Sequence, residues 1–400
     1  MKRVIKYLLV VASIAPLSCS MARDGEFDYA RDSGIGSSSE NGQGGGFAGK
    51  VTAGEWNDLD NWMFWSNLMT TEAGQDQHGQ GVDYSAFGKY WGFYTNNRVA
   101  VQVVDGEGQP VHGVKLELER NGQVIWSAVS DNAGNANCWI SLFQKEDGLV
   151  ADQMVLIADG VRSAERVQVT TLSTTEDVKV NRVVVGKSAK LNSADIAFIV
   201  DATGSMSDEI NFLKADLLDI LDKTSKSQSS VAFRTAALFY RDRGDEYVTR
   251  ESNFADFKTT TSFISKQRAS GGGDYPEAVH TALETSLQKL SWKEDSGCAK
   301  IAFMLLDAPA HYTENVLMSL HKSIETYAQK GIKLIPVAAS GVDKATEFML
   351  RFFAIATGGT YVFITNDSGI GNDHIEASVG EYKVEALNDL IVRLITKYTE

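Results

Sequence analysis

A carboxylate and two hydroxyl residues stand two positions apart, at Asp201, Thr203 and Ser205, directly after the apolar run 197–200. Short apolar runs are typical of buried strands in a parallel sheet, and open α/β sheets bind ligands at the carboxyl ends of their strands. The three side chains offer hard oxygen donors, a set that suits Mg²⁺, Mn²⁺ or Ca²⁺. Alternatively, Ser205 or Ser207 only caps the helix that follows. The motif therefore predicts either a divalent-metal site or a helix cap.

Two further segments favour the metal site. Residues 270–277 read Ser-Gly-Gly-Gly-Asp-Tyr-Pro-Glu, so Asp274 directly follows three glycines. Glycines allow backbone conformations that would bring Asp274 close to the first loop. The apolar run 304–306 ends in another carboxylate, Asp307. Because the carboxyl ends of parallel strands meet at one edge of a sheet, we expect these acids to gather around the same cation as Asp201.

The elements that must position these residues follow from a change of pattern near residue 194, where strand-like runs begin to alternate with helical stretches. This alternation predicts a parallel sheet covered by helices, that is, a doubly wound α/β domain over 187–400. Residues 246–250 predict a short antiparallel edge strand. The strand-like runs are 195–200, 231–240, 300–306, 332–338 and 360–364.

Residues 96–186 have a period-two pattern that predicts an all-β sandwich. The run 104–114, with the turn 130–134, resembles immunoglobulin-like modules of bacterial surface proteins and the regulatory β-sandwich of carboxypeptidases. That resemblance implies a spacer. The alternating runs are 99–104, 114–118, 123–129 and 137–142.

Residues from about 190 to 400 resemble the von Willebrand factor type A (vWA) domain. The metal-ion-dependent adhesion site of that family has the motif Asp-x-Ser/Thr-x-Ser, which is Asp201-x-Thr203-x-Ser205 here. The resemblance implies that Thr203 and Ser205 bind the metal directly and that Asp201 and Asp307 act largely through water. Asp274 stands where the family usually has a threonine ligand, as in a bacterial subset with Gly-Gly-Gly-Asp loops. Three carboxylates would overcompensate a divalent ion, which would strengthen metal binding and weaken the ion's pull on a ligand carboxylate.

This resemblance implies a non-enzymatic, metal-dependent protein-binding module for adhesion or assembly, with Mg²⁺ (or Mn²⁺ or Ca²⁺) as cofactor and an acidic side chain of a protein ligand completing the site. Two alternatives remain open. One is a metal-dependent hydrolase or phosphoryl-transfer enzyme, in which an aspartate after a strand is the nucleophile. The other is a structural envelope component whose metal only holds loops together. His280 and His311 lie near the site loops, but the histidines show no metal-ligand spacing, and we interpret His311 as a solvated loop residue.

The N-terminus predicts export to the bacterial cell envelope. Basic residues precede the apolar run 7–17, as in a secretory signal. The following Leu-Ser-Cys19 resembles a bacterial lipobox except at Pro16, and it implies a signal over 1–19 with lipid attachment at Cys19. The chain would then meet the membrane only through this lipid anchor, at the outer membrane or cell surface. Cleavage after Ala22 would instead give a secreted or periplasmic protein.

The remaining segments complete the predicted organisation. Residues 20–54 are rich in Gly and Ser and predict a flexible tether, whereas 55–95 are dense in aromatic residues and are interpreted as an arm packed on the next domain. Stacking against carbohydrate or a partner is the alternative for this arm. A formal net charge of −14 argues against nucleic-acid binding. Cys138 and Cys298 fall in separate predicted domains and are expected to be buried and unpaired.

Overall fold

The computed structural model describes residues 51–71, 82–146, 153–186, 191–227, 230–368 and 374–400. The predicted signal segment, Cys19 and nearly all of the predicted tether lie outside these residues. In this part of the chain, no helix combines the length and the apolar character that a membrane span needs.

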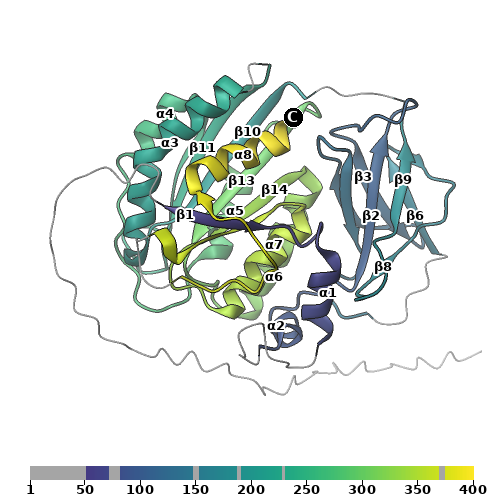
Figure 1. Cartoon of the computed structure of the whole chain (residues 1–400), viewed down its shortest axis with the longest axis horizontal. Coiled ribbons are helices and arrows are strands. Elements are labelled where there is room, and N and C mark those ends of the chain that lie inside the picture. Colours follow the sequence, from purple (N-terminus) through teal and green to yellow (C-terminus); the bar gives the residue numbers. More distant parts are fainter. Residues whose placement is uncertain (1–50, 72–81, 147–152, 187–190, 228–229, 369–373) are drawn as a thin grey trace, which may run out of the picture. The chain divides into compact units, whose positions relative to one another are not determined.

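An eight-stranded sheet forms the centre of the C-terminal part (Figure 1). Its strand order is β12-β11-β10-β13-β14-β15-β1-β16, and the neighbours from β11 to β15 run parallel. The strands are β1 (Thr52–Trp56), β10 (Ser193–Asp201), β11 (Ala232–Tyr240), β12 (Thr249–Ala255), β13 (Cys298–Leu306), β14 (Ile332–Ala338), β15 (Tyr361–Ile364) and β16 (Glu385–Ala386).

The five predicted parallel strands are therefore confirmed. The antiparallel edge strand is confirmed as β12, but it begins at Thr249 and extends to Ala255, beyond the predicted 246–250. Consecutive side chains of β10 enter two different cores, with Phe198 on one face of the sheet and Ile199 on the other. Both faces of the sheet are apolar and need a cover of helices.

Helices cover both faces of this sheet. Leu217 of α3 and Leu394 of α8 belong to the core of one face, together with Ile264 of α4. Leu283 of α5, Leu320 of α6 and the aromatic residues of α7 belong to the core of the other face. The domain is thus doubly wound α/β. The helices are α3 (Ser207–Ser227), α4 (Phe257–Ile264), α5 (Val279–Lys289), α6 (Glu314–Lys330), α7 (Lys344–Thr357) and α8 (Leu387–Thr399).

Strand β1 corrects the predicted tether and the predicted domain boundary. It pairs antiparallel with β15 on one side and with β16 on the other, so a segment near residue 52 completes a sheet made mostly of residues after 190 (Figure 1). Val51 and Ala53 are buried. These alternating apolar residues are few and are flanked by glycines in the sequence, which is why the stretch up to 54 was interpreted as tether.

The aromatic segment 55–95 packs on the sheet domain through α1 (Trp62–Thr70) and α2 (Tyr84–Trp91). The ring of Trp65 stacks on Phe348 of α7 with centroids 5.8 Å apart, and Phe93 stacks on Phe352 at 4.0 Å. All four residues are buried. These rings therefore contribute to a packed interior.

A buried ion-pair network ties the same segment to α7. Arg351 is fully buried, and its guanidinium donates to both carboxylate oxygens of Asp58 and to the carbonyl oxygen of Ser378. Glu347, one turn earlier, accepts hydrogen bonds from the Tyr84 hydroxyl at 3.0 Å and from the Ser378 amide at 2.7 Å. Since buried charges persist only when paired, this network fixes how the segment sits on α7.

The β-rich region between the aromatic segment and the α/β domain contains two four-stranded sheets. One has the order β5-β2-β8 with β9 also pairing with β2, and the other has the order β4-β3-β6-β7. Their apolar side chains share one core. The strands are β2 (Asn97–Val104), β3 (Lys115–Arg120), β4 (Gln123–Val129), β5 (Asn135–Trp139), β6 (Met154–Ala158), β7 (Val161–Arg162), β8 (Thr170–Thr171) and β9 (Val180–Val184).

The first three predicted runs of this region are confirmed as β2, β3 and β4. The fourth, predicted over 137–142, occurs earlier as β5, and β6 to β9 were not predicted. Cys138 and Cys298 are both buried and free of disulfides, as expected.

Candidate metal centre

Loops from four places in the sequence meet at the carboxyl ends of the parallel strands. The first follows β10 and carries Asp201 to Ser205, and the second follows β11 with Asp242 and Asp245. The third is the glycine-rich loop 270–277 before α5, and the fourth follows β13 from Asp307 to Thr313. Hydrogen bonds join them directly, since the Gly204 amide donates to the Gly271 carbonyl at 3.1 Å.

Asp201 is the buried centre of this region. Its side chain is fully shielded from solvent, and its Oδ1 accepts hydrogen bonds from the Thr203 amide at 2.9 Å and the Thr203 hydroxyl at 2.8 Å. The other oxygen, Oδ2, is buried and has no hydrogen-bond partner among the residues that the structure describes. A buried carboxylate oxygen that accepts no hydrogen bond destabilises the folded protein unless a cation compensates its charge.

The electrostatics around Asp201 favour a cation. Burial and the negative charge of Asp307 together raise the pKa of Asp201 to about 7, against the hydrogen bonds from Thr203 that lower it. Burial likewise raises the pKa of Glu277 to about 9, with contributions from the charges of Asp201, Asp242, Asp307 and Asp245. A divalent cation would reverse both shifts, because it stabilises the ionised carboxylates.

A further buried acid, Glu209, stands in the first turn of α3. Its Oε1 accepts a hydrogen bond from the Ser340 hydroxyl at 3.2 Å, and its Oε2 is buried with no hydrogen-bond partner in the described part of the chain. Burial raises the pKa of Glu209, and the charge of Asp307 adds a smaller effect in the same direction. Glu209 therefore belongs to the same negatively charged region and links it to the end of β14.

Arg241 anchors the first loop through hydrogen bonds to its backbone. Its Nε donates to the carbonyl oxygen of Ala202 at 3.1 Å, and its Nη2 donates to the carbonyl oxygen of Arg268 at 2.8 Å. The Ser270 amide donates to the same Ala202 carbonyl at 3.0 Å. These contacts bind the guanidinium to backbone oxygens and connect the strand β11 to both the Asp201 loop and the glycine-rich loop.

Glycines are required where the glycine-rich loop meets Asp245. Gly271 has a φ of +86°, and a Cβ added there would lie 2.3 Å from the Asp245 carboxylate. That carboxylate accepts a hydrogen bond from the Gly272 amide at 3.1 Å. Gly272 also has a positive φ, and a Cβ there would contact Thr203 and Glu277 at 3.4 Å. The close approach of the two loops therefore depends on these two residues.

The structure separates the five predicted ligands into groups. Asp201, Thr203 and Asp307 lie together and are buried, whereas Ser205 is exposed in the 3₁₀ turn Gly204–Met206. Asp274 is exposed, and its carboxylate lies within 4.8 Å of ligand atoms of Asp242 and His311. The acid that the glycine-rich loop brings into electrostatic contact with Asp201 and Asp307 is Glu277, three residues further along. The roles of the five residues as metal ligands remain predictions.

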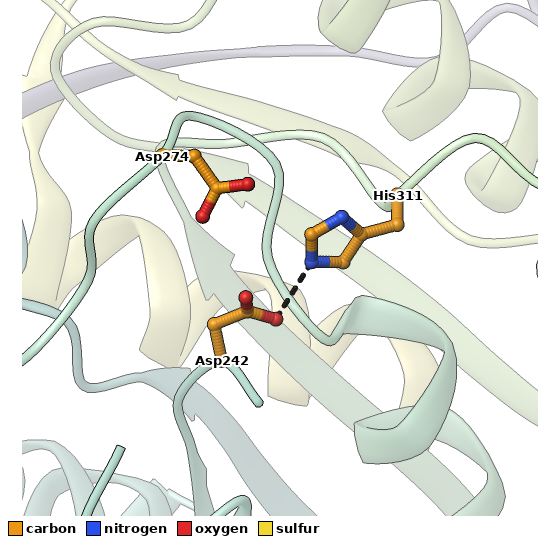
Figure 2. A group of neighbouring side chains, drawn as sticks. All are labelled: Asp242, Asp274 and His311. Carbon is orange, nitrogen blue, oxygen red and sulfur yellow. Dashed lines mark hydrogen bonds and ion pairs between the residues drawn. The ribbon is translucent and has the colours of Figure 1, made fainter. Parts of the chain in front are cut away.

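The interpretation of His311 as a solvated residue is wrong. Its Nε2 bonds to Oδ1 of Asp242 at 2.7 Å, so the loop after β13 contacts the loop after β11 (Figure 2). Figure 2 shows Asp274 facing the same pair from the glycine-rich loop. Sequence reasoning also missed Glu277, Glu209 and Asp242. The one signal available for Glu277 was its place within the same glycine-rich loop.

Comparison with known proteins supports the assignment of the sheet domain. A family model described as the von Willebrand factor A domain matches residues 195–344. An alpha-protein kinase, vwkA, of Dictyostelium discoideum is 30% identical over 146 residues, which is 35% of this chain and 22% of the relative. A putative ariadne-like RING finger protein, R811, of Acanthamoeba polyphaga mimivirus is 33% identical over 136 residues, which is 33% of this chain and 13% of the relative.

The fold and these matches together define the class: residues 195–344 are a vWA domain, in an α/β domain that follows a β-rich region. A vWA domain suggests a function in protein interaction or adhesion, and such domains often bind a divalent metal. The chain spans less than a quarter of the length of either relative, so the activities that their names state belong to those proteins.

Proposed function

We propose that this protein is a divalent-cation-dependent protein-binding module, acting in adhesion or assembly, with its ion at Asp201, Thr203, Ser205 and Asp307. The observation that carries the proposal is the buried pair of Asp201 and Asp307, in which the charge of one raises the pKa of the other. The donors are carboxylates and hydroxyls, which Mg²⁺ prefers and Mn²⁺ or Ca²⁺ also accept. When bound, the ion supplies a positive centre that an acidic side chain of a protein ligand completes.

The hydrogen bonds and burial of Asp201 favour a binding function over a catalytic one. A nucleophilic aspartate must present a carboxylate oxygen to its substrate. Oδ1 of Asp201 already accepts two hydrogen bonds from Thr203, and its side chain is fully buried. The geometry therefore suits an acid that holds a cation in place rather than one that attacks a phosphoryl or acyl group.

The site of action that we propose is the bacterial cell envelope, with lipid attachment at Cys19. The support is the basic and apolar N-terminal segment followed by Leu-Ser-Cys, and the Gly/Ser-rich stretch that continues to about residue 50. A tether of this composition would let the folded domains reach a partner at a distance from the lipid.

Thermal unfolding of the full mature chain tests the metal site. Mg²⁺ at about 100 times its Kd should stabilise the native state by about 2.7 kcal/mol, which raises Tm by roughly 5–10 °C in a domain of this size. Asp201→Asn should abolish this shift. Asp222→Asn is the matched control, because this exposed acid near the far end of α3 pairs with solvent-facing Lys226. Equal Mg²⁺ responses in wild type and Asp201→Asn would refute the site.

The binding function is tested by capture of envelope proteins on the immobilised chain with Mg²⁺ or with EDTA. A partner should be retained with Mg²⁺, be released by EDTA, and be absent with Asp201→Asn but present with Asp222→Asn. Capture that is indifferent to EDTA and to Asp201→Asn would contradict a metal-dependent module. Hydrolysis of phosphoesters or peptides in Mg²⁺ that is lost in Asp201→Asn would establish the enzymatic alternative instead.

A further inference from the structure

A second group of ligand-type side chains lies beside the Asp201 region. One ligand atom each of Asp242, Asp274 and His311 falls within 4.8 Å of the others. The three residues come from three separate loops, after β11, before α5 and after β13, and Figure 2 shows their side chains converging. The group differs from the Asp201 site because it contains an imidazole.

Two buried side chains border this group. His280, at the start of α5, is 5% exposed, and within the described residues its buried Nδ1 has no hydrogen-bond partner. Glu277 is 3% exposed, and its Oε2 is likewise without a partner. The charges of His311 and Asp242 both act on His280, and the charge of Asp242 acts on Glu277. Unpartnered nitrogen and oxygen atoms at such depth are expected where a ligand completes them.

The geometry of the Asp242–His311 pair suits replacement of a proton by a metal. Nε2 of His311 and Oδ1 of Asp242 are 2.7 Å apart and are joined by a hydrogen bond. Zinc ligands lie about 2.0–2.2 Å from the ion, so two ligand atoms of a tetrahedral site are about 3.3 Å apart. A small widening of the pair admits the ion, which an imidazole can bind through Nε2 when its Nδ1 carries the proton.

We propose that Asp242, Asp274 and His311 form a second cation site, which takes a transition-metal ion of the Zn²⁺ or Co²⁺ type. Imidazole with carboxylates is a donor set for such ions, whereas the carboxylates and hydroxyls at Asp201 suit Mg²⁺ or Ca²⁺. The buried imidazole of His280, on which the charges of Asp242 and His311 act, is a neighbour of this donor set. The proposal is independent of the metal site at Asp201, because it uses none of Asp201, Thr203, Ser205 and Asp307.

The test is a Co²⁺ titration of the full mature chain, free of any affinity tag, with Mg²⁺ in excess to fill the oxygen site. Isothermal calorimetry and the visible d–d absorption of Co²⁺ should show one equivalent bound in the wild type. His311→Ala and Asp274→Asn should each weaken Co²⁺ binding at least about tenfold. Both side chains are at least partly exposed, so these variants should fold.

Two controls separate this site from the Asp201 site and from general effects. Asp201→Asn should keep the Co²⁺ absorption while losing the Mg²⁺ response. His321→Gln removes an imidazole that bonds to the Trp91 carbonyl in another part of the domain, and it should leave Co²⁺ binding unchanged. Absorption that survives in both His311→Ala and Asp274→Asn, or that His321→Gln reduces as much as His311→Ala does, would overturn the second site.

Discussion

Replacement of Asp201 by asparagine should stabilise the metal-free protein at neutral pH. The pKa of this carboxyl group is raised from 3.8 to about 7 by burial and by Asp307. Well below pH 3.8 the group is protonated in the folded and unfolded states alike. Between pH 4 and 7 the unfolded state releases the proton while the folded state retains it, so the free energy of unfolding falls as the pH rises. Above pH 7 the full penalty is present.

The size of the effect follows from the shift. One pKa unit corresponds to about 1.4 kcal/mol, so a shift of about three units costs the metal-free wild type about 4 kcal/mol at most. Asparagine avoids this cost but weakens the hydrogen bonds from Thr203, which contribute about 1 kcal/mol. In EDTA at pH 8, Asp201→Asn should therefore be more stable than the wild type by roughly 3 kcal/mol, and this difference should vanish near pH 4.

Urea denaturation of the full mature chain from pH 4 to pH 8, in EDTA and in Mg²⁺, measures these differences. Saturating Mg²⁺ should remove the advantage of the variant, because the ion stabilises only the wild-type carboxylate. Asp222→Asn, at an exposed position, should follow the wild type throughout. A variant less stable than the wild type in EDTA at pH 8, or a difference that does not change with pH, would refute the assignment of Asp201 as an uncompensated buried acid.

Three further predictions concern the rest of the chain. Arg351→Met should destabilise the protein by about 3–5 kcal/mol in urea denaturation, because it leaves the buried carboxylate of Asp58 unpaired; a loss below about 1 kcal/mol would contradict the network. Gly271→Ala should cost about 1–3 kcal/mol and weaken the Mg²⁺ response, whereas Gly273→Ala, with an open Cβ position in the same loop, should do neither; equal effects would remove the argument from backbone conformation. Cys19→Ala should abolish incorporation of labelled palmitate in cells, and retained labelling would exclude Cys19 as the lipid site.

The parallel strands were predictable because each is a local pattern, an apolar run of strand length that ends in a polar residue. Asp201 and Asp307 were found for the same reason. The pair of His311 and Asp242 was not, since the two residues are 69 positions apart and meet only through the conformations of two loops. Strand β1 was missed because five residues carry too little pattern, and its place in the sheet comes from pairing with β15 and β16.

The glycine-rich loop decides how strongly an ion at Asp201 would attract a ligand. From the sequence, Asp274 was expected to add a third negative charge to those of Asp201 and Asp307. In the structure its carboxylate lies with Asp242 and His311, and the acid directed toward the first site is Glu277, whose burial and neighbours raise its pKa to about 9. That pKa applies to the metal-free protein, and a cation at Asp201 would favour the ionised form of Glu277. The ion would then face the carboxylates of Asp201, Asp307 and Glu277, so its attraction for an incoming carboxylate stays weakened, as three acids predict. The structure thus replaces Asp274 by Glu277 as the third acid and keeps the expected overcompensation of the ion.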